Sequence, residues 1–163
     1  MSLRHVPVIF NQQLLHHHLR RAAAGDFSQD FMRQRVAEDI ASRLSLIKRE
    51  FKLCALFGDN SDCMVSALEN LPNLHKLISV STIDPVAPTA LKQLIVGSEE
   101  HLALKNESIN LAISPLTLQF ANDLPGALIQ LKRSLKPDGL FIGAFLGGDI
   151  LVELRDALLS AEI

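Results

Sequence analysis

The sequence contains neither tryptophan nor tyrosine, so only its eight phenylalanines could provide aromatic stacking against a base or a sugar. Cysteine is almost as scarce. Cys54 and Cys63 form no CxxC motif, which predicts two reduced, buried thiols in a cytoplasmic protein rather than a disulfide framework. The formal net charge is only −2, and without an excess of basic residues nucleic acid is not expected as a partner.

Long apolar runs are missing as well. The longest, Leu140 to Leu146, falls far short of the ~20 residues that span a bilayer, and the first residues show no signal-peptide pattern. What remains is a chain of 163 residues that is 48% hydrophobic and 21% charged, which is typical of one globular domain with a sizeable core. We expect a single domain over residues 1–163, with N-terminal helices in 11–50 and a core in 52–163.

Two helices are predicted before residue 52. The first covers residues 11–25, has Leu14, Leu15 and Leu19 on its apolar side, and stops at Gly25. Ser28 is the expected N-cap of the second, longer helix. The buried stripe of that helix is formed by residues at helical spacing: Phe31 or Met32, Val36, Ile40, Leu44 and Ile47.

From residue 52 onward, five short apolar runs alternate with helical patterns. The runs cover residues 53–57, 77–80, 94–96, 109–113 and 140–145, and continuous runs of this kind are typical of strands covered on both faces. The alternation predicts a parallel sheet with helices on its faces. Ligands of such sheets bind beyond the carboxyl ends of the strands. We therefore expect one cleft among the loops that follow four of the runs, after Phe57, Val80, Val96 and Ile113.

Two helices toward the end of the chain are marked by their sequence. One follows Asp123, has Pro125 in its first turn, and stops at a turn formed by residues 136–139. The last helix of the chain carries Leu154 and Leu158 at helical spacing, and we expect them to form an ordinary core stripe.

The same part of the chain carries a resemblance to a known family. Its two most specific segments are Leu135-Lys-Pro-Asp-Gly-Leu-Phe141 and Leu146-Gly-Gly-Asp-Ile-Leu-Val-Glu-Leu-Arg155. The first resembles the approach to the fifth strand in class I S-adenosylmethionine-dependent methyltransferases. With the second, and with residues 9–31, the chain is similar to the methyltransferase-like assembly factors of respiratory complex I and to the related carrier-protein methyltransferases of biotin synthesis.

The resemblance implies a Rossmann-like, three-layer α/β fold whose parallel sheet has about five strands and lacks the last two strands usual in the family. It also implies S-adenosylmethionine as the cofactor. In the family the first strand leads through an acidic residue into a Gly-x-Gly-x-Gly turn, where the absence of side chains lets the backbone approach the ligand. Here Gly58 is retained, but Leu56 stands at the acidic position and Asn60 and Asp62 replace the other two glycines.

The acidic residues that hold the ribose and the adenine in the family correspond to Ser81 and Ser98 here, with Glu99 or Glu100 as a substitute. Two lost charged hydrogen bonds, at roughly 1.5–3 kcal/mol each, would weaken a micromolar ligand to millimolar, because micromolar affinity represents only about 8 kcal/mol. The residues predicted to contact the cofactor lie in the loops after the strands: Gly58, Asp59, Asn60, Ser81, Thr82, Ser98, Glu99 and Ser114.

No metal site is predicted. His16, His17 and His18 follow one another on a helix and would point about 100° apart, which does not suit ligation of one ion. His75 and His101 are isolated in the sequence, and we expect both to face solvent.

Three functions remain open. The resemblance implies a methyltransferase acting on a small molecule or a protein side chain; that chemistry needs an aligned nucleophile more than a catalytic group, so no catalytic residue is assigned. The substituted cofactor motifs fit a non-catalytic binding or assembly module instead. A dinucleotide-binding oxidoreductase is disfavoured because Gly58 begins no Gly-x-Gly-x-x-Gly fingerprint.

We also expect a homodimer, because residues 140–145 would form an uncovered apolar sheet edge.

Overall fold

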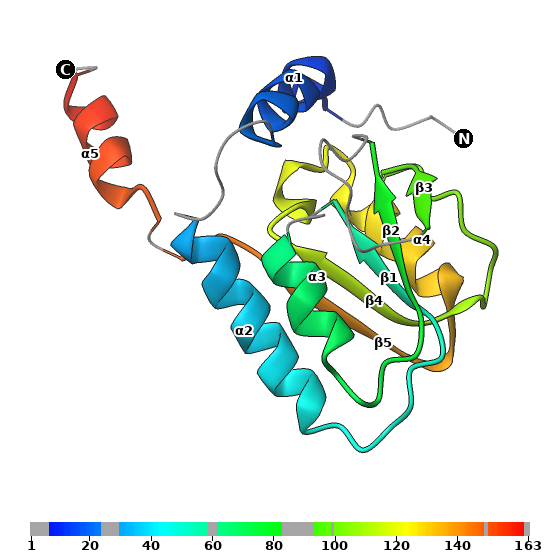
Figure 1. The fold of residues 1–163 in the computed structure, drawn as a ribbon. Helices are drawn as coiled ribbons and strands as arrows, with labels where there is room; N and C mark the ends of the chain where they lie inside the picture. The colour runs from blue at the N-terminus through cyan, green and yellow to red at the C-terminus, as the bar shows by residue number, and fades with distance from the viewer. Residues whose placement is uncertain are drawn as a thin grey trace, which may run out of the picture.

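The computed structural model describes residues 7–23, 30–58, 62–82, 93–98, 100–148 and 150–161. Five strands form one parallel sheet in the order β3-β2-β1-β4-β5 (Figure 1). Their bounds are β1 Cys54–Phe57, β2 Leu77–Ser81, β3 Leu94–Val96, β4 Ile109–Pro115 and β5 Leu135–Ala144. The order changes direction between β1 and β4, which is the position where parallel α/β sheets bind their ligands.

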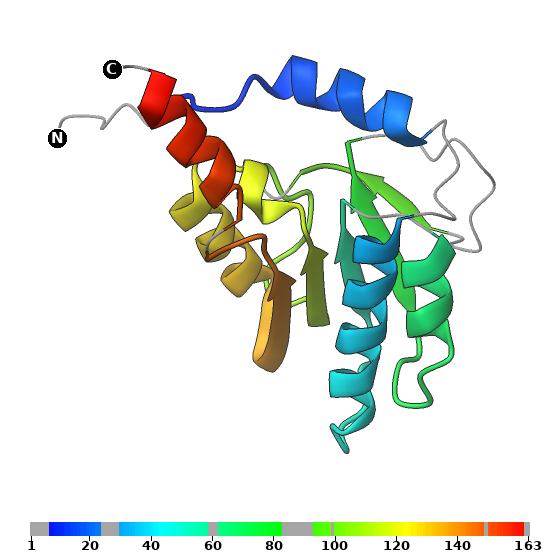
Figure 2. The ribbon, with the colours of Figure 1, turned by 90° about the vertical axis from the view of Figure 1, so that its left-hand side faces the viewer.

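Helices cover both faces of this sheet, as the sequence predicted. Helices α2 (Phe31–Ser45) and α3 (Asp62–Glu69) lie on one face, and α4 (Leu124–Ser134) lies on the other (Figure 2). The side chains of β1 alternate between the two layers. Cys54 and Leu56 belong to the cluster with α2 and α3, whereas Ala55 and Phe57 belong to the cluster with α4. The whole strand is buried, which explains its continuous apolar run.

The caps of α2 and α4 show how the sequence sets the two layers. The side chain of Asp123 accepts a hydrogen bond from the Gly126 amide at 2.9 Å, and the first turn of α4 contains a proline, as predicted. The predicted cap of α2, Ser28, lies outside the described residues. The prediction was wrong, because the side chain of Asp30 caps α2 by accepting from the Arg33 amide at 3.1 Å.

Several predicted core positions of the helices are exposed. The buried stripe of α2 is Ala37, Ile40 and Leu44, whereas Phe31 in its first turn is 77% exposed. Cys63 in α3 is half-buried rather than buried. Cys54 is a free, buried thiol, and its burial raises its pKa.

The turn predicted at residues 136–139 lies within β5 rather than before it. Ile109 pairs with Leu135 and Leu111 pairs with Leu140, so the register shifts between the two pairs. Asp138, in the inserted segment, has a φ of 62°. The extra residues form an irregularity in the strand, which reads as a turn in the sequence because the same residue types favour both.

Helix α5 (Val152–Ala161) extends beyond β5 and contains no buried residue (Figure 1). Leu154 is 52% exposed and Leu158 is 59% exposed, so the predicted core stripe is wrong. The pattern itself is present, but no described element covers it. None of the described helices combines the length and the apolar character needed to cross a membrane.

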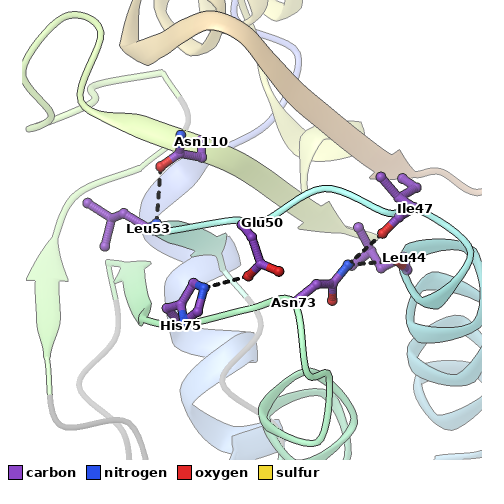
Figure 3. A network of polar contacts seen from close by, with 7 residues as sticks. All are labelled: Leu44, Ile47, Glu50, Leu53, Asn73, His75 and Asn110. Carbon is purple, nitrogen blue, oxygen red and sulfur yellow. Dashed lines mark hydrogen bonds and ion pairs between the residues drawn. The ribbon is translucent and has the colours of Figure 1, made fainter.

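The amino ends of the strands are joined by side-chain hydrogen bonds (Figure 3). The Asn73 amide nitrogen donates to the carbonyls of Leu44 and Ile47, at 3.1 and 2.9 Å. His75, which is exposed as predicted, pairs with Glu50 at 2.5 Å. This edge of the sheet is therefore closed by the chain itself.

Candidate functional site

The carboxyl ends of the strands line a cleft of about 290 Å³. Its floor includes Gly58 after β1, Ser81 at the end of β2 with Thr82 after it, and Gly97 and Ser98 after β3. The end of β4 and the residues after it line one side of the cleft with Pro115, Leu116 and Thr117. Specific ligand pockets run from about 300 Å³ upward, so this volume suits a small organic ligand.

Gly58 is fixed by its backbone. Its φ is +73°, a conformation that other residues rarely adopt, and its amide donates to the Val80 carbonyl at 2.8 Å. A Cβ at this position would lie 2.5 Å from Cγ2 of Thr117. The Thr117 hydroxyl in turn shares a 2.7 Å hydrogen bond with Ser114. The turn after β1 and the loop after β4 therefore meet at a distance that only glycine permits.

The residues predicted to contact a cofactor come together here in part. Gly58, Ser81, Thr82 and Ser98 all line the cleft. Ser114 is fully buried beneath it and supports Thr117. The remaining predicted residues, Asp59, Asn60 and Glu99, lie outside the described residues, as does the side chain of Asp62.

Glu100, the other candidate for the adenine contact, is engaged elsewhere. Its Oε1 accepts from the Asp123 amide at 2.7 Å, and its Oε2 accepts from the side chain of Gln12 at 3.4 Å. Its carbonyl accepts from the side chain of Gln130 at 2.7 Å. The carboxylate lines the cleft but joins the start of α4 to the N-terminal helix.

The N-terminal helix α1 (Gln12–Ala23) covers the cleft, a contact that the sequence did not predict. Figure 2 shows α1 lying across the carboxyl ends of the strands. Its residues Gln12, Leu15, His16 and Leu19 line the cleft, whereas Leu14, expected on the buried side, is 53% exposed. Their spacing could have predicted this contact, because the four residues recur at intervals of three and four and so share one face of the helix. Two of them are polar, however, and they weaken the apolar stripe.

The start of α1 is tied to the segment between β4 and α4. The side-chain oxygen of Asn122 accepts from the amides of Ile9 and Phe10, at 2.7 and 2.8 Å. The ring of Phe10 meets the ring of Phe120 edge-on, with centroids 5.8 Å apart. Gln12 also donates to the Phe120 carbonyl at 3.0 Å. Four contacts thus fix one end of the cover.

The charged groups of the cleft are also paired. Asp30 and Arg33, at the start of α2, form an ion pair of 3.1 Å. Among the described residues, no group of three or more histidine, cysteine, aspartate or glutamate side chains is arranged to hold a metal ion. The floor is therefore neutral and rich in hydroxyl groups, and it can accept and donate hydrogen bonds to a polar ligand.

Sequence comparison with known proteins finds methyltransferase-like relatives. The family described as Methyltransferase domain matches residues 59–143. The human arginine-hydroxylase NDUFAF5, mitochondrial, is 36% identical over 142 residues, which cover 82% of this chain and 40% of that protein. The malonyl-[acyl-carrier protein] O-methyltransferase of Gallionella capsiferriformans is 43% identical over 72 residues, covering 44% of this chain and 25% of that one.

The fold is also found among solved structures. The PH0226 protein of Pyrococcus horikoshii superimposes with a TM-score of 0.62 at 18% identity, covering 79% of this chain and 64% of that one. The chain spans about two fifths of the length of the NDUFAF5 relatives that it matches. The matched segment 59–143 covers half of the chain and runs from the turn after β1 to β5. The chain therefore belongs to the class I S-adenosylmethionine-dependent methyltransferase superfamily.

Proposed function

We propose that the cleft beneath α1 binds S-adenosylmethionine and that the domain transfers its methyl group to a small molecule or a protein side chain. The observation that carries the proposal is Gly58, whose positive φ and contact with Thr117 hold the turn after β1 against the cleft. S-Adenosylmethionine, when bound, supplies an electrophilic methyl group. The contribution of the chain is then to orient the two reactants and to exclude water.

The residues fit such a ligand with neutral contacts. Ser81, Thr82 and Ser98 offer hydroxyl groups along the floor, and the family places carboxylates at the positions of Ser81 and Ser98. A neutral hydrogen bond contributes about 1 kcal/mol, roughly half of a charged one. We therefore expect weak, millimolar affinity in the isolated domain.

Calorimetric titration with S-adenosylmethionine tests the proposal, and two variants at one site sharpen it. Ser81→Asp restores a carboxylate where the family has one, and we expect it to tighten binding at least tenfold, the factor that corresponds to about 1.4 kcal/mol. Ser81→Asn has the same size without the charge and serves as the matched control. No heat at millimolar ligand from the wild type or Ser81→Asp would show that the cleft does not hold the cofactor.

One observation favours a second function, a binding or assembly module without catalysis. Ser81 is only 5% exposed and neutral at the ribose position, and the Glu100 carboxylate already serves the chain's own amides. The resemblance to assembly factors suggests respiratory complex I as the setting. A specific protein partner that is retained equally with and without S-adenosylmethionine would support this alternative, and loss of the partner in cofactor-free buffer would exclude it.

The human relative is named an arginine-hydroxylase, which makes an arginine side chain one acceptor to test. Methyl transfer and hydroxylation are distinguishable by mass, because the first adds a methyl group to the peptide and the second adds an oxygen atom. An arginine-containing peptide incubated with the domain and S-adenosylmethionine is expected to gain the methyl group. Gain of oxygen alone would contradict methyl transfer.

We also propose a homodimer through the edge of β5. In the described sheet β5 pairs only with β4, although its Leu140, Phe141 and Ile142 pack against the two core clusters. The open part is therefore the backbone edge and the apolar residues that follow it, Phe145 and Leu146, which are 46% and 40% exposed. Light scattering tests the proposed homodimer, and a strict monomer would contradict it.

We also propose a cytoplasmic location, which rests on the free thiol of Cys54.

A further inference from the structure

Helix α1 presents one ionisable side chain to the cleft. His16 lines the cleft and is half-buried, whereas its neighbours His17 and His18 are exposed. The three residues have the same chemistry, so only their positions on the helix distinguish them. His16 lies one turn after Gln12, on the same face of α1.

The position of His16 is set by the anchored end of α1. Gln12 donates to the Phe120 carbonyl at 3.0 Å, and Asn122 holds the preceding backbone. Because the anchor lies a single turn before His16, the imidazole keeps its side of the helix turned toward the cleft. The floor opposite is formed by the ends of β1, β2 and β3.

The other charged groups that line the cleft have partners in the chain. Asp30 and Arg33, from the start of α2, pair with each other, and Glu100, from the β3–β4 connection, accepts from the Asp123 amide. His16 makes no hydrogen bond to another described residue. A neutral imidazole can accept a proton near neutral pH, and a side chain so placed suits general base catalysis.

We propose that His16 is the proton acceptor for the substrate in this cleft, and that the substrate is therefore an amine, a guanidine or a hydroxyl rather than a carboxylate. This inference rests on the proposed methyl transfer. The acceptor nitrogen or oxygen forms a bond to the methyl carbon with its lone pair, and the carbon–sulfur bond breaks with its electron pair going to sulfur. The proton of the acceptor passes to the unprotonated ring nitrogen of His16. A carboxylate has no proton to lose and would need no such residue.

Nitrogen NMR of the histidine rings tests the inference without requiring turnover. The full chain, labelled at its histidines, is compared alone, with S-adenosylmethionine, and with S-adenosylhomocysteine, which lacks the methyl group and its charge. His16→Gln and His17→Gln assign the resonances, and the second is the matched control because His17 lies beside the cleft-facing residue but is exposed. Calorimetry on the same samples reports binding.

We expect both ligands to shift the ring resonances of His16, by different amounts because only one carries the sulfonium charge, and to leave those of His17 and His18 in place. The proposed step needs one ring nitrogen of His16 to be without a proton in the S-adenosylmethionine complex, and the nitrogen shifts report this directly. Binding with unmoved His16 resonances, or a protonated His16 in that complex, overturns this inference alone. Absence of binding overturns the proposed cofactor together with it.

Discussion

The two ends of the sheet differ in how the chain uses its polar groups. At the amino end, loops that precede β1 and β2 bond to each other: the Phe51 amide donates to the Asn73 carbonyl at 2.7 Å, and the His75 amide donates to the Phe51 carbonyl at 3.0 Å. At the carboxyl end, Ser81, Thr82 and Ser98 face a cleft instead. Figure 3 shows the closed end and Figure 2 shows the end that α1 covers.

This difference separates the end of the sheet that stabilises the fold from the end that is placed to bind a ligand. Hydrogen bonds between loops stabilise the amino end, and their loss leaves buried groups without partners. At the carboxyl end, the positive φ of Gly58 fixes the turn after β1, and polar side chains line a cleft. Substitutions at the two ends should therefore separate effects on unfolding from effects on ligand binding.

The largest effect is expected from Gly58→Ala. The positive φ costs about 1–2 kcal/mol for an L-residue, and the new methyl group 2.5 Å from Thr117 adds about 1–3 kcal/mol of overpacking. Thr117 cannot turn aside freely, because its hydroxyl is bonded to Ser114. We expect the free energy of unfolding in urea to fall by about 2–5 kcal/mol and ligand binding to be lost.

Gly148→Ala is the matched control for this variant. Gly148 has a φ of +72° but nothing within 4 Å of the added methyl group. Only the backbone cost of about 1–2 kcal/mol is expected there, with unchanged ligand binding. Equal losses from the two variants would mean that the contact with Thr117 has no part in fixing the turn.

A half-buried asparagine should give the next largest effect, at the opposite end. Asn73→Ala removes the donor that serves the carbonyls of Leu44 and Ile47 at the end of α2. We expect a loss of about 1–3 kcal/mol in urea unfolding, with ligand affinity unchanged. The side-chain oxygen of Asn73 is buried and has no hydrogen-bond partner among the described residues. Removing that oxygen offsets part of the cost, so we expect a loss nearer about 1 than 3 kcal/mol.

Asn70→Ala is the control for the closed end. Asn70 also donates to a backbone carbonyl, that of Ser66 at 2.8 Å, but it is exposed. A change within about 0.5 kcal/mol is expected for such a surface position. If Asn70→Ala cost as much as Asn73→Ala, the amino end would not owe its stability to the partly buried hydrogen bonds of Asn73.

The contrast between the two ends also shows what the sequence can predict. The continuous apolar runs of β1 and β4 predicted a sheet buried on both faces, because period and burial are local properties of the sequence. Whether Leu154 finds a covering partner is not local, so a regular stripe was mistaken for core. The helix cap was misplaced because Ser28 and Asp30 are both residue types that cap helices, and sequence alone does not decide between them.

The cleft could be predicted only in outline. Strand ends predicted which loops meet, and the structure brings Gly58, Ser81 and Ser98 to one cleft. The contribution of α1 was missed, because Gln12 and His16 interrupt its apolar face and their anchor, Asn122, lies more than a hundred residues away in sequence. Contacts at that separation leave no periodic signal in either segment.

A smaller effect is expected from Asn122→Ala, which loosens the cover of the cleft. Asn122 accepts from two amides ahead of α1, and these bonds are exposed or partly buried. We expect global unfolding to change by about 1 kcal/mol or less, and amide hydrogen exchange in α1 to accelerate on the order of tenfold through local opening. Exchange that accelerates equally in β1 would contradict a local role for Asn122.

The smallest effect is expected from His75→Gln at the amino end. The 2.5 Å contact between His75 and Glu50 is short, but the side chains are 56% and 64% exposed. Solvent screens such a pair, and surface ion pairs contribute about 0–1 kcal/mol. A double-mutant cycle with Glu50→Gln, measured by urea unfolding, should give a coupling below about 1 kcal/mol. A coupling larger than the loss from Asn73→Ala would mean that the ion pair, rather than the half-buried Asn73 amide, holds this end of the sheet closed.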